Sequence, residues 1–358
     1  MPYFSLKAFS LWLAALACLL AAPARAGITY NMVTVGNAGN ANDTGGGLIG
    51  AVAHDYQIGK YDVTIGQYTA FLNAVAATDT YSLYNSNMGT NGNIAGISQT
   101  VGSGGYTYSV VGSANRPVAY VSWWDSARFS NWMANGQPSG AQTSTTTEDG
   151  AYNVNGATTG NAVAKNATNP NTSAAPTFFI PNQNEWYKAA YYSPTLNSSS
   201  GGYYTYATQS NTAPGNVVGS AANQANYIAG NLYSVTQSST YNGTQNYLTD
   251  VGAFSGSGSF YGTFDQSGNV YQWNDLDGAP GSSRGLRGGN WNFDAAILSS
   301  SFSSSNDPGY ENVYIGFRLA SPVSAPSGVP EIDPNGLSAV LGLIAGGLGL
   351  LERRRYDR

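Results

Sequence analysis

The stretch from Phe264 to Arg318 decides how this chain folds, and three short pieces of it stand out. They read G-N-V-Y-Q-W at 268–273, R-G-G-N-W at 287–291 and G-F-R at 316–318. The tryptophans of the first two pieces are large apolar side chains, and their indole N–H groups need acceptors when the rings are buried. Glycines beside aromatic residues mark places where the backbone turns sharply or where a ring approaches it closely. Core packing and turn formation are therefore the first interpretation of these residues.

The composition of the whole chain favours an exported protein with long polar loops. Of 358 residues only 9% are charged, while 45 are glycine and 26 are tyrosine, so the surface must be covered largely by uncharged polar side chains. A hydrophobic content of 42% is enough for a core and argues against wholesale disorder. The formal net charge is −5 and the sequence has no basic stripe, which makes nucleic acid a poor partner.

The N-terminal residues 1–26 are predicted to form a signal peptide. Lys7 precedes an apolar run at 11–22, and Ala-Arg-Ala at 24–26 has the small-residue pattern of a cleavage site. We expect signal peptidase to cut after this tripeptide. The only cysteine, Cys18, lies within the leader, so the mature chain should contain neither disulfides nor thiolate metal ligands.

Capping boxes predict three helices. In such a box, the N-cap side chain and the side chain three residues later each accept a hydrogen bond from the other residue's backbone N–H. The boxes begin at Thr64, Ser122 and Asn182. Apolar residues follow each box at helical spacing, so each helix should present one buried face to a core.

Strands and long polar loops are predicted between and after these helices. Strands are expected over 56–63 and 177–180. The segments 81–106 and 136–175 are rich in Gly, Asn, Ser and Thr, and loops of this length inside a domain are either functional or mobile. The segment 204–264 has the pattern of short strands broken by turns, with aromatic residues scattered through it.

Six motifs follow one another in a fixed order between about residue 50 and residue 320. They are V-T-I-G-Q-Y-T-A-F-L-N at 63–73, R-P-V-A-Y-V-S-W-W-D-S-A at 116–127, F-I-P-N-Q-N-E-W-Y-K-A-A at 179–190, G-N-V-Y-Q-W at 268–273, R-G-G-N-W at 287–291 and G-F-R at 316–318. Together they resemble the formylglycine-generating enzyme (sulfatase-modifying factor) family. The resemblance implies one domain over 27–320 with an α+β, C-type-lectin-like fold. Such a fold has little regular secondary structure, a few short capped helices and short antiparallel strands.

The same resemblance implies that the oxidase chemistry of this family is absent. The family's oxidases hold copper between two cysteines just after the glycine pair, and those places fall near Phe293 and Leu298 in this chain. Hydrocarbon side chains supply no thiolate for Cu(I). The related iron-dependent sulfoxide synthases need several histidines, whereas His54 is the only one here, and we expect it to be an ordinary surface or strand-edge residue. We therefore predict no catalytic residue and no copper.

Calcium is the one cofactor that the resemblance leaves open. Residues at two places correspond to the family's calcium ligands, which include backbone carbonyls. They are Asp265, Gly268, Val270 and Gln272 at the first place, and Asn226 and Tyr227 at the second. Gln272 stands where the family has an acid, so we expect weak binding or none. The alternative is that these residues form only hydrogen-bonded turns.

The C-terminal residues 329–358 resemble a PEP-CTERM sorting signal. The motif V-P-E-I-D-P at 329–334 precedes an apolar run at 337–351, and three arginines follow. The resemblance implies cleavage near Pro330 by an exosortase and delivery to the cell surface, outer envelope or extracellular matrix of a Gram-negative-type bacterium. Residues 321–328 would be a spacer, and 337–351 would form a transmembrane helix before processing; a permanent anchor is the alternative.

The function that these observations favour is non-catalytic binding of carbohydrate or another extracellular polymer at the cell surface. Tyr and Trp faces stack on sugars, while Asn and Gln side chains satisfy hydroxyl groups. Two alternatives remain at this point. One is an oxidoreductase of the same family with altered metal chemistry, and the other is a structural matrix protein without a defined ligand.

Three further charged residues are predicted to be structural. Asp125 and Glu185 each occupy the third helical position, where a carboxylate interacts favourably with the helix dipole. Arg318 is expected to pair with a buried acid, because an unpaired buried charge is too costly to keep.

Overall fold

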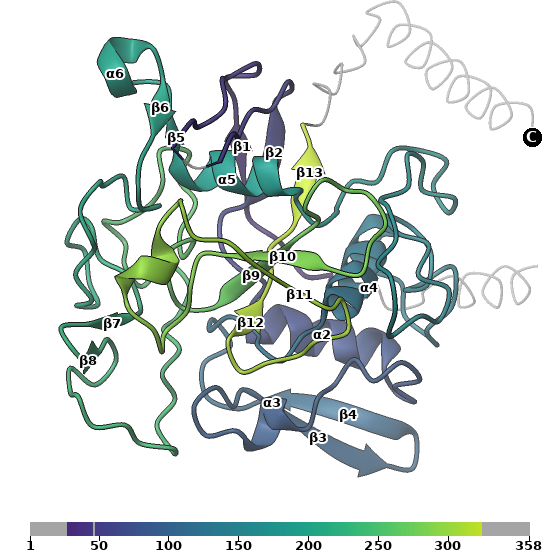
Figure 1. The fold of residues 1–358 in the computed structure, drawn as a ribbon. Helices are drawn as coiled ribbons and strands as arrows, with labels where there is room; N and C mark the ends of the chain where they lie inside the picture. The colour runs from purple at the N-terminus through teal and green to yellow at the C-terminus, as the bar shows by residue number, and fades with distance from the viewer. Residues whose placement is uncertain (1–26, 46, 324–358) are drawn as a thin grey trace, which may run out of the picture. The chain divides into compact units, whose positions relative to one another are not determined.

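Capped helices and short strands, joined by long loops, make up the computed structural model of this chain (Figure 1). The model describes residues 27–45 and 47–323. The predicted signal peptide, the sorting signal and all of the spacer beyond Val323 lie outside the described residues. The elements considered below belong to one compact unit that ends at Ser321, apart from the last residue of the final strand.

The three predicted helices are confirmed with their caps. They are α2 (Ile65–Val75), α4 (Trp123–Ala134) and α5 (Gln183–Tyr191), and in each the capping box is complete. In the box of α4, Ser122 N–H donates to Asp125 Oδ2 at 2.8 Å and Asp125 N–H donates to Ser122 Oγ at 3.0 Å. Shorter helical turns are α3 (Asn87–Thr90), α6 (Leu196–Ser199) and the 3-10 turn η1 (Ala295–Leu298).

Two small sheets carry the motifs from the C-terminal part of the domain. The larger has the order β11-β10-β9-β12, in which β12 is parallel to β9 and the other pairs are antiparallel. Its strands are β9 (Tyr271–Asn274), β10 (Arg284–Arg287), β11 (Ser304–Asn306) and β12 (Ile315–Gly316). The second has the order β1-β2-β13, with β1 (Met32–Val35), β2 (Tyr56–Gly59) and β13 (Ala320–Pro322).

Three two-stranded hairpins complete the regular structure of the described residues. They pair β3 (Ile97–Gly102) with β4 (Gly105–Val110), β5 (Tyr192–Ser193) with β6 (Gly202–Tyr203), and β7 (Ile228–Ala229) with β8 (Leu232–Tyr233). In Figure 1, the larger sheet lies in the middle of the view, with α5 above it and α2 below it. The mixture of short helices and mostly antiparallel strands confirms the predicted α+β class.

The main hydrophobic core lies between α2, α4 and the G-F-R motif at 316–318. Phe71 of α2 contacts Phe129 of α4 edge to face, with ring centroids 5.2 Å apart. Phe129 contacts Phe317 in the same way at 5.4 Å. All of these rings are fully buried, so aromatic burial holds the two capped helices against the segment that leads into β13.

Three sequence-based expectations about strands need correction. The strand predicted over 56–63 ends at Gly59, because the chain leaves β1 there and Val63 N–H bonds to Phe317 O at 2.9 Å instead. The strand predicted over 177–180 is only a single bridge between Phe179 and Ala320. The predicted loop 81–106 contains β3 and the first residues of β4.

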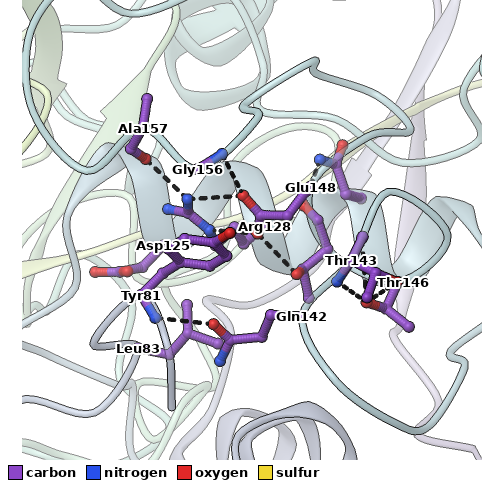
Figure 2. A network of polar contacts seen from close by, with 12 residues as sticks. Tyr81, Leu83, Asp125, Arg128, Gln142, Thr143, Thr146, Glu148, Gly156 and Ala157 are labelled. Atoms are coloured by element: carbon purple, nitrogen blue, oxygen red, sulfur yellow. Dashed lines mark hydrogen bonds and ion pairs between the residues drawn. The ribbon is translucent and has the colours of Figure 1, made fainter. Parts of the chain in front are cut away.

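The long polar segment 136–175 is held by a buried ion pair rather than by secondary structure. Within its fully described length it contains turns and isolated bridges but no helix and no strand. Arg128 of α4 reaches Glu148 in this segment with two bonds, Nε to Oε1 at 2.8 Å and Nη2 to Oε2 at 3.0 Å (Figure 2). Arg128 also donates to Ala157 O at 2.8 Å and packs over the Tyr81 ring at 4.6 Å.

Candidate functional site

Six aromatic side chains from distant parts of the sequence form one contact network near β8 and the end of β10. We call this set the aromatic platform; it consists of Tyr233, Tyr241, Tyr247, Trp291, Phe293 and Tyr314. Tyr247 and Trp291 stack face to face, with centroids 4.8 Å apart and planes 8° apart. Tyr241 continues the stack at 6.0 Å and 14°.

The platform has a buried base and an exposed face. Tyr247 and Trp291 are almost fully buried, whereas Tyr241 is 55% exposed and Phe293 is 48% exposed. Tyr314 links the buried base to the exposed face, since its ring centroid lies 5.5 Å from that of Trp291 and 5.9 Å from that of Phe293. The exposed rings are therefore presented to solvent by neighbours that hold their positions.

Asparagine side chains fix the hydroxyl groups of these tyrosines. Tyr241 Oη donates to Asn93 Oδ1 at 2.5 Å. Asn292 Nδ2 donates to Tyr314 Oη at 2.8 Å. Tyrosine rings ordered in this way offer apolar faces and nearby amides together, at a low cost in conformational entropy.

The two buried motif tryptophans differ in their hydrogen bonding. The indole N–H of Trp291 is buried and finds no acceptor among the described residues. Trp273 Nε1, by contrast, donates to Val121 O at 2.9 Å. The prediction that both indoles find acceptors is therefore confirmed for Trp273 only.

The residues predicted for the first calcium site lie together, but the side chain of Gln272 is already used in hydrogen bonds within the protein. Gln272 Oε1 accepts from Trp186 Nε1 at 2.7 Å and from Arg318 Nε at 2.7 Å. Gln272 Nε2 donates to Asp265 O at 2.8 Å. Since a carboxamide oxygen has two lone pairs, Gln272 has none left for a cation in this arrangement.

The other residues of that place supply one carboxylate and a buried turn. Asp265 Oδ2 accepts from Gly252 N–H at 2.7 Å, and burial raises the pKa of Asp265 to about 6. Gly268 adopts φ +86°, and a side chain there would collide with Asn226 O. Val270 is fully buried in the core. The set offers one carboxylate, of raised pKa, for an ion that takes six to eight oxygens.

The second calcium place adjoins the first through a bridge between Asn226 and Gly268. Asn226 O accepts from Asn269 N–H at 2.8 Å, and Asn226 Nδ2 donates to Tyr247 O at 2.9 Å. Tyr227 O accepts from Asn216 Nδ2 at 3.1 Å. Within the described part of the chain, no group of three or more His, Cys, Asp or Glu is placed to hold a metal ion. Calcium binding stays a prediction, and these residues fit the ion poorly.

Comparison with known proteins identifies the family. A family model described as "Sulfatase-modifying factor enzyme 1-like domain" matches residues 34–323. The chain belongs to this family. No curated protein matches it.

Solved structures similar to this sulfatase-modifying-factor domain share little sequence with it. A crystal structure of CarF is 20% identical, with a TM-score of 0.45, and covers 82% of this chain and 99% of its own. Treponema denticola variable protein 1 is 18% identical, with a TM-score of 0.49 and coverages of 83% and 96%. PvdO from Pseudomonas aeruginosa is 16% identical, with a TM-score of 0.40 and coverages of 83% and 93%. At identities this low, no ligand or chemistry is transferred to this chain.

The two positions near which the family resemblance predicts the copper cysteines, Phe293 and Leu298, have different surroundings. Phe293 lies on the exposed face of the aromatic platform. Leu298, at the end of η1, is fully buried and lies so close to Gly289 that a Cβ there would come within 2.6 Å of it. Neither side chain fits copper, and the only cysteine in the sequence, Cys18, lies outside the described residues.

The remaining charged residues that the sequence singled out have structural contacts. Asp125 and Glu185 complete the capping boxes of α4 and α5. His54 is largely exposed, with Nε2 3.2 Å from Glu185 Oε1. Arg318 pairs with Asp62, Nη2 to Oδ1 at 3.1 Å, and both are fully buried. Sequence reasoning predicted a buried acid for Arg318 but did not find Asp62, because 256 positions separate the two.

Proposed function

We propose that this protein is a non-catalytic member of the sulfatase-modifying-factor family that binds carbohydrate, or a similar neutral extracellular polymer, through the aromatic platform. The observation that carries the proposal is the continuous stack from buried Trp291 through Tyr247 to exposed Tyr241. An exposed aromatic ring that is held in place can stack on the apolar face of a sugar ring.

The charge of the chain and the groups around the platform favour a neutral ligand. The formal net charge is −5, so an acidic polymer would be repelled at long range. The polar groups that contact the platform rings through hydrogen bonds are uncharged amides, including Asn93 and Asn292. Amide groups donate to and accept from hydroxyl groups equally well.

The absence of catalysis is part of this proposal. Phe293 and Leu298 supply no sulfur where the family's oxidases have cysteines, and Phe293 adds an exposed ring to the platform instead. The oxidoreductase alternative has no observation in its favour beyond family membership, and fold does not imply function. Assaying the purified full chain for conversion of a cysteine peptide to formylglycine tests this part, and turnover would overturn it.

We also propose that the chain is exported, with signal peptidase and an exosortase as processing partners. The support is the sequence alone, namely the leader 1–26 and the tail 329–358. Among the described residues, no helix is long and apolar enough to cross a membrane, and the predicted helix 337–351 lies outside them. Intact-mass measurement of surface material should give a chain that begins at Gly27 and lacks 337–351.

Glycan binding by the full chain tests the central proposal. On an array of neutral and acidic glycans, we expect binding to neutral oligosaccharides and little binding to acidic ones. Binding to acidic glycans alone would contradict the proposal. Binding to no glycan and to no neutral polymer would leave a structural matrix protein as the better interpretation.

A further inference from the structure

A recess separate from the aromatic platform lies where the start of the described chain meets the beginning of α2. Its volume is about 590 Å³, within the range of small-molecule sites. Four parts of the chain line it, and the residues that matter for its chemistry are Asn31, Tyr61, Asp62, Gln67 and Asn115. No residue of the aromatic platform lines it. We call this recess the Asp62 cleft.

Among the described residues that line the cleft, Asp62 is the only acidic one, and none is Lys, Arg or His. Asp62 Oδ1 pairs with Arg318 Nη2 at 3.1 Å. Asp62 Oδ2 is buried and has no hydrogen-bond partner among the described residues. Because Arg318 already balances the charge of Asp62, the lining offers a strong acceptor without a net charge to attract an ion.

The wall of the cleft is held firmly by its own hydrogen bonds. Gln67 Nε2 donates to Thr29 O at 2.8 Å, and Gln67 Oε1 accepts from Thr64 N–H at 3.0 Å. Tyr30 Oη donates to Tyr61 O at 3.0 Å. The recess is therefore built by residues whose polar groups are already used within the chain.

Three lining groups, by contrast, remain available to a ligand. Asn31 and Asn115 are exposed, and their side-chain amides make no hydrogen bond to the described residues. The Tyr61 ring is half-buried, with the Phe264 ring 5.7 Å and Lys60 Nζ 5.3 Å from its centroid, and the part that stays exposed lines the cleft. An aromatic ring, two amides and an unpaired carboxylate oxygen form a set that matches a ring with several hydroxyl groups.

We propose that the Asp62 cleft binds one or two units of a neutral sugar, independently of the aromatic platform. A sugar hydroxyl donates to Asp62 Oδ2 after a small opening of the cleft floor, the ring packs on Tyr61, and the Asn31 and Asn115 amides bind further hydroxyls. The inference shares its class of ligand with the proposed function but uses a different surface. An anionic sugar is disfavoured because none of the described residues that line the cleft has a cationic side chain.

Titration of the full chain with neutral hexoses and their disaccharides, followed by ligand-observed NMR, tests the inference. Glucuronic acid and glucosamine serve as charged comparators. Asn115→Trp fills the mouth of the cleft without removing any hydrogen bond of the Asn115 side chain. Asn161→Trp, at another exposed asparagine that does not line the cleft, is the matched control.

We expect the unaltered chain and Asn161→Trp to bind a neutral sugar alike, and Asn115→Trp to bind it at least about tenfold more weakly at an unchanged melting temperature. Tyr241→Ala, in the aromatic platform, should leave this binding unchanged. Equal binding by Asn115→Trp, preference for a charged sugar, or no binding of short sugars would overturn the inference. If polymer binding through the platform persists in such a case, only the cleft proposal fails; if it is also lost, the proposed function fails as well.

Discussion

Trp291 and Tyr247 lie face to face, with ring centroids 4.8 Å apart and planes 8° apart. Trp291 belongs to the R-G-G-N-W motif, whereas Tyr247 comes from the irregular segment between β8 and β9. A motif residue thus holds an otherwise loosely structured, tyrosine-rich segment in place. This contact connects the family's fold to the exposed rings that we propose as the binding surface.

The two buried motif tryptophans should differ in their response to loss of the indole N–H. Trp273 Nε1 donates to Val121 O, whereas Trp291 Nε1 has no acceptor among the described residues. Trp273→Phe should therefore reduce the free energy of unfolding by about 1 kcal/mol more than Trp291→Phe, because only the former leaves a buried carbonyl without a donor. Denaturant unfolding of both variants measures the difference, and a larger loss for Trp291→Phe would contradict it.

Stability should decrease as pH rises from about 4 to about 7. Burial raises the pKa of Asp265 to about 6 and that of Asp275 to about 6. In the unfolded chain an aspartate titrates near about 3.9, so the folded state binds these protons more tightly. The stabilisation from that binding is complete below the unfolded pKa and is lost as pH rises through the folded values.

One substitution separates the contribution of Asp265 to this pH dependence. Asp265→Asn keeps an oxygen for Gly252 N–H and removes the titration, so its melting temperature should fall less between pH 4.5 and 7, which lie on either side of the folded pKa of about 6. Asp277→Asn, at an exposed position, is the control and should follow the unaltered chain. A stability that increases over this range would contradict the assigned direction.

Calcium should have little effect on the unaltered chain. Gln272 uses both lone pairs of Oε1 on Trp186 and Arg318, and its amide donates to Asp265 O. We expect no shift in melting temperature between EDTA and millimolar calcium. Gln272→Glu adds a carboxylate and removes the donor to Asp265 O, so this variant should melt lower in EDTA and recover in part with calcium. A calcium shift in the unaltered chain equal to that of the variant would contradict this account.

The buried pair of Arg318 and Asp62 should be essential for folding. Arg318 also donates to Gln272 Oε1, to Gly59 O at 2.9 Å and to Phe264 O at 2.7 Å. Arg318→Met leaves these acceptors and a buried carboxylate without a donor, which should cost about 3–5 kcal/mol. Arg318→Lys keeps the charge but not the planar fork and should cost less. A loss below about 1 kcal/mol for Arg318→Met, measured by denaturant unfolding, would contradict the structural role.

Local patterns in the sequence predicted the helices well. Each capping box involves residues three positions apart, so the starts of α2, α4 and α5 could be placed at Thr64, Ser122 and Asn182. The hairpin of β3 and β4 is not predicted, because Gly, Ser, Thr and Gln make up most of β3 and half of β4. Two glycines, Gly102 and Gly105, flank its turn and were the available indication.

The candidate surface could not be assembled from the sequence in the same way. Tyr241, Tyr247, Trp291 and Tyr314 stand in three separate segments, each residue outside any helix or strand, and only the tertiary fold brings their rings into contact. The same is true of Asp62, whose pairing with Arg318 spans most of the domain. The high aromatic content of the sequence predicted a surface that can stack on sugars, but it did not locate that surface in the fold.

The measurement that tests the central claim most directly compares binding of a neutral polysaccharide by three variants of the full chain. Tyr241→Ala and Phe293→Ala each remove an exposed ring of the aromatic platform, and Phe260→Ala removes a similarly exposed ring elsewhere. We predict that each platform variant binds at least about tenfold more weakly, while Phe260→Ala binds like the unaltered chain. Unchanged binding by both platform variants, with their melting temperatures preserved, would contradict the claim.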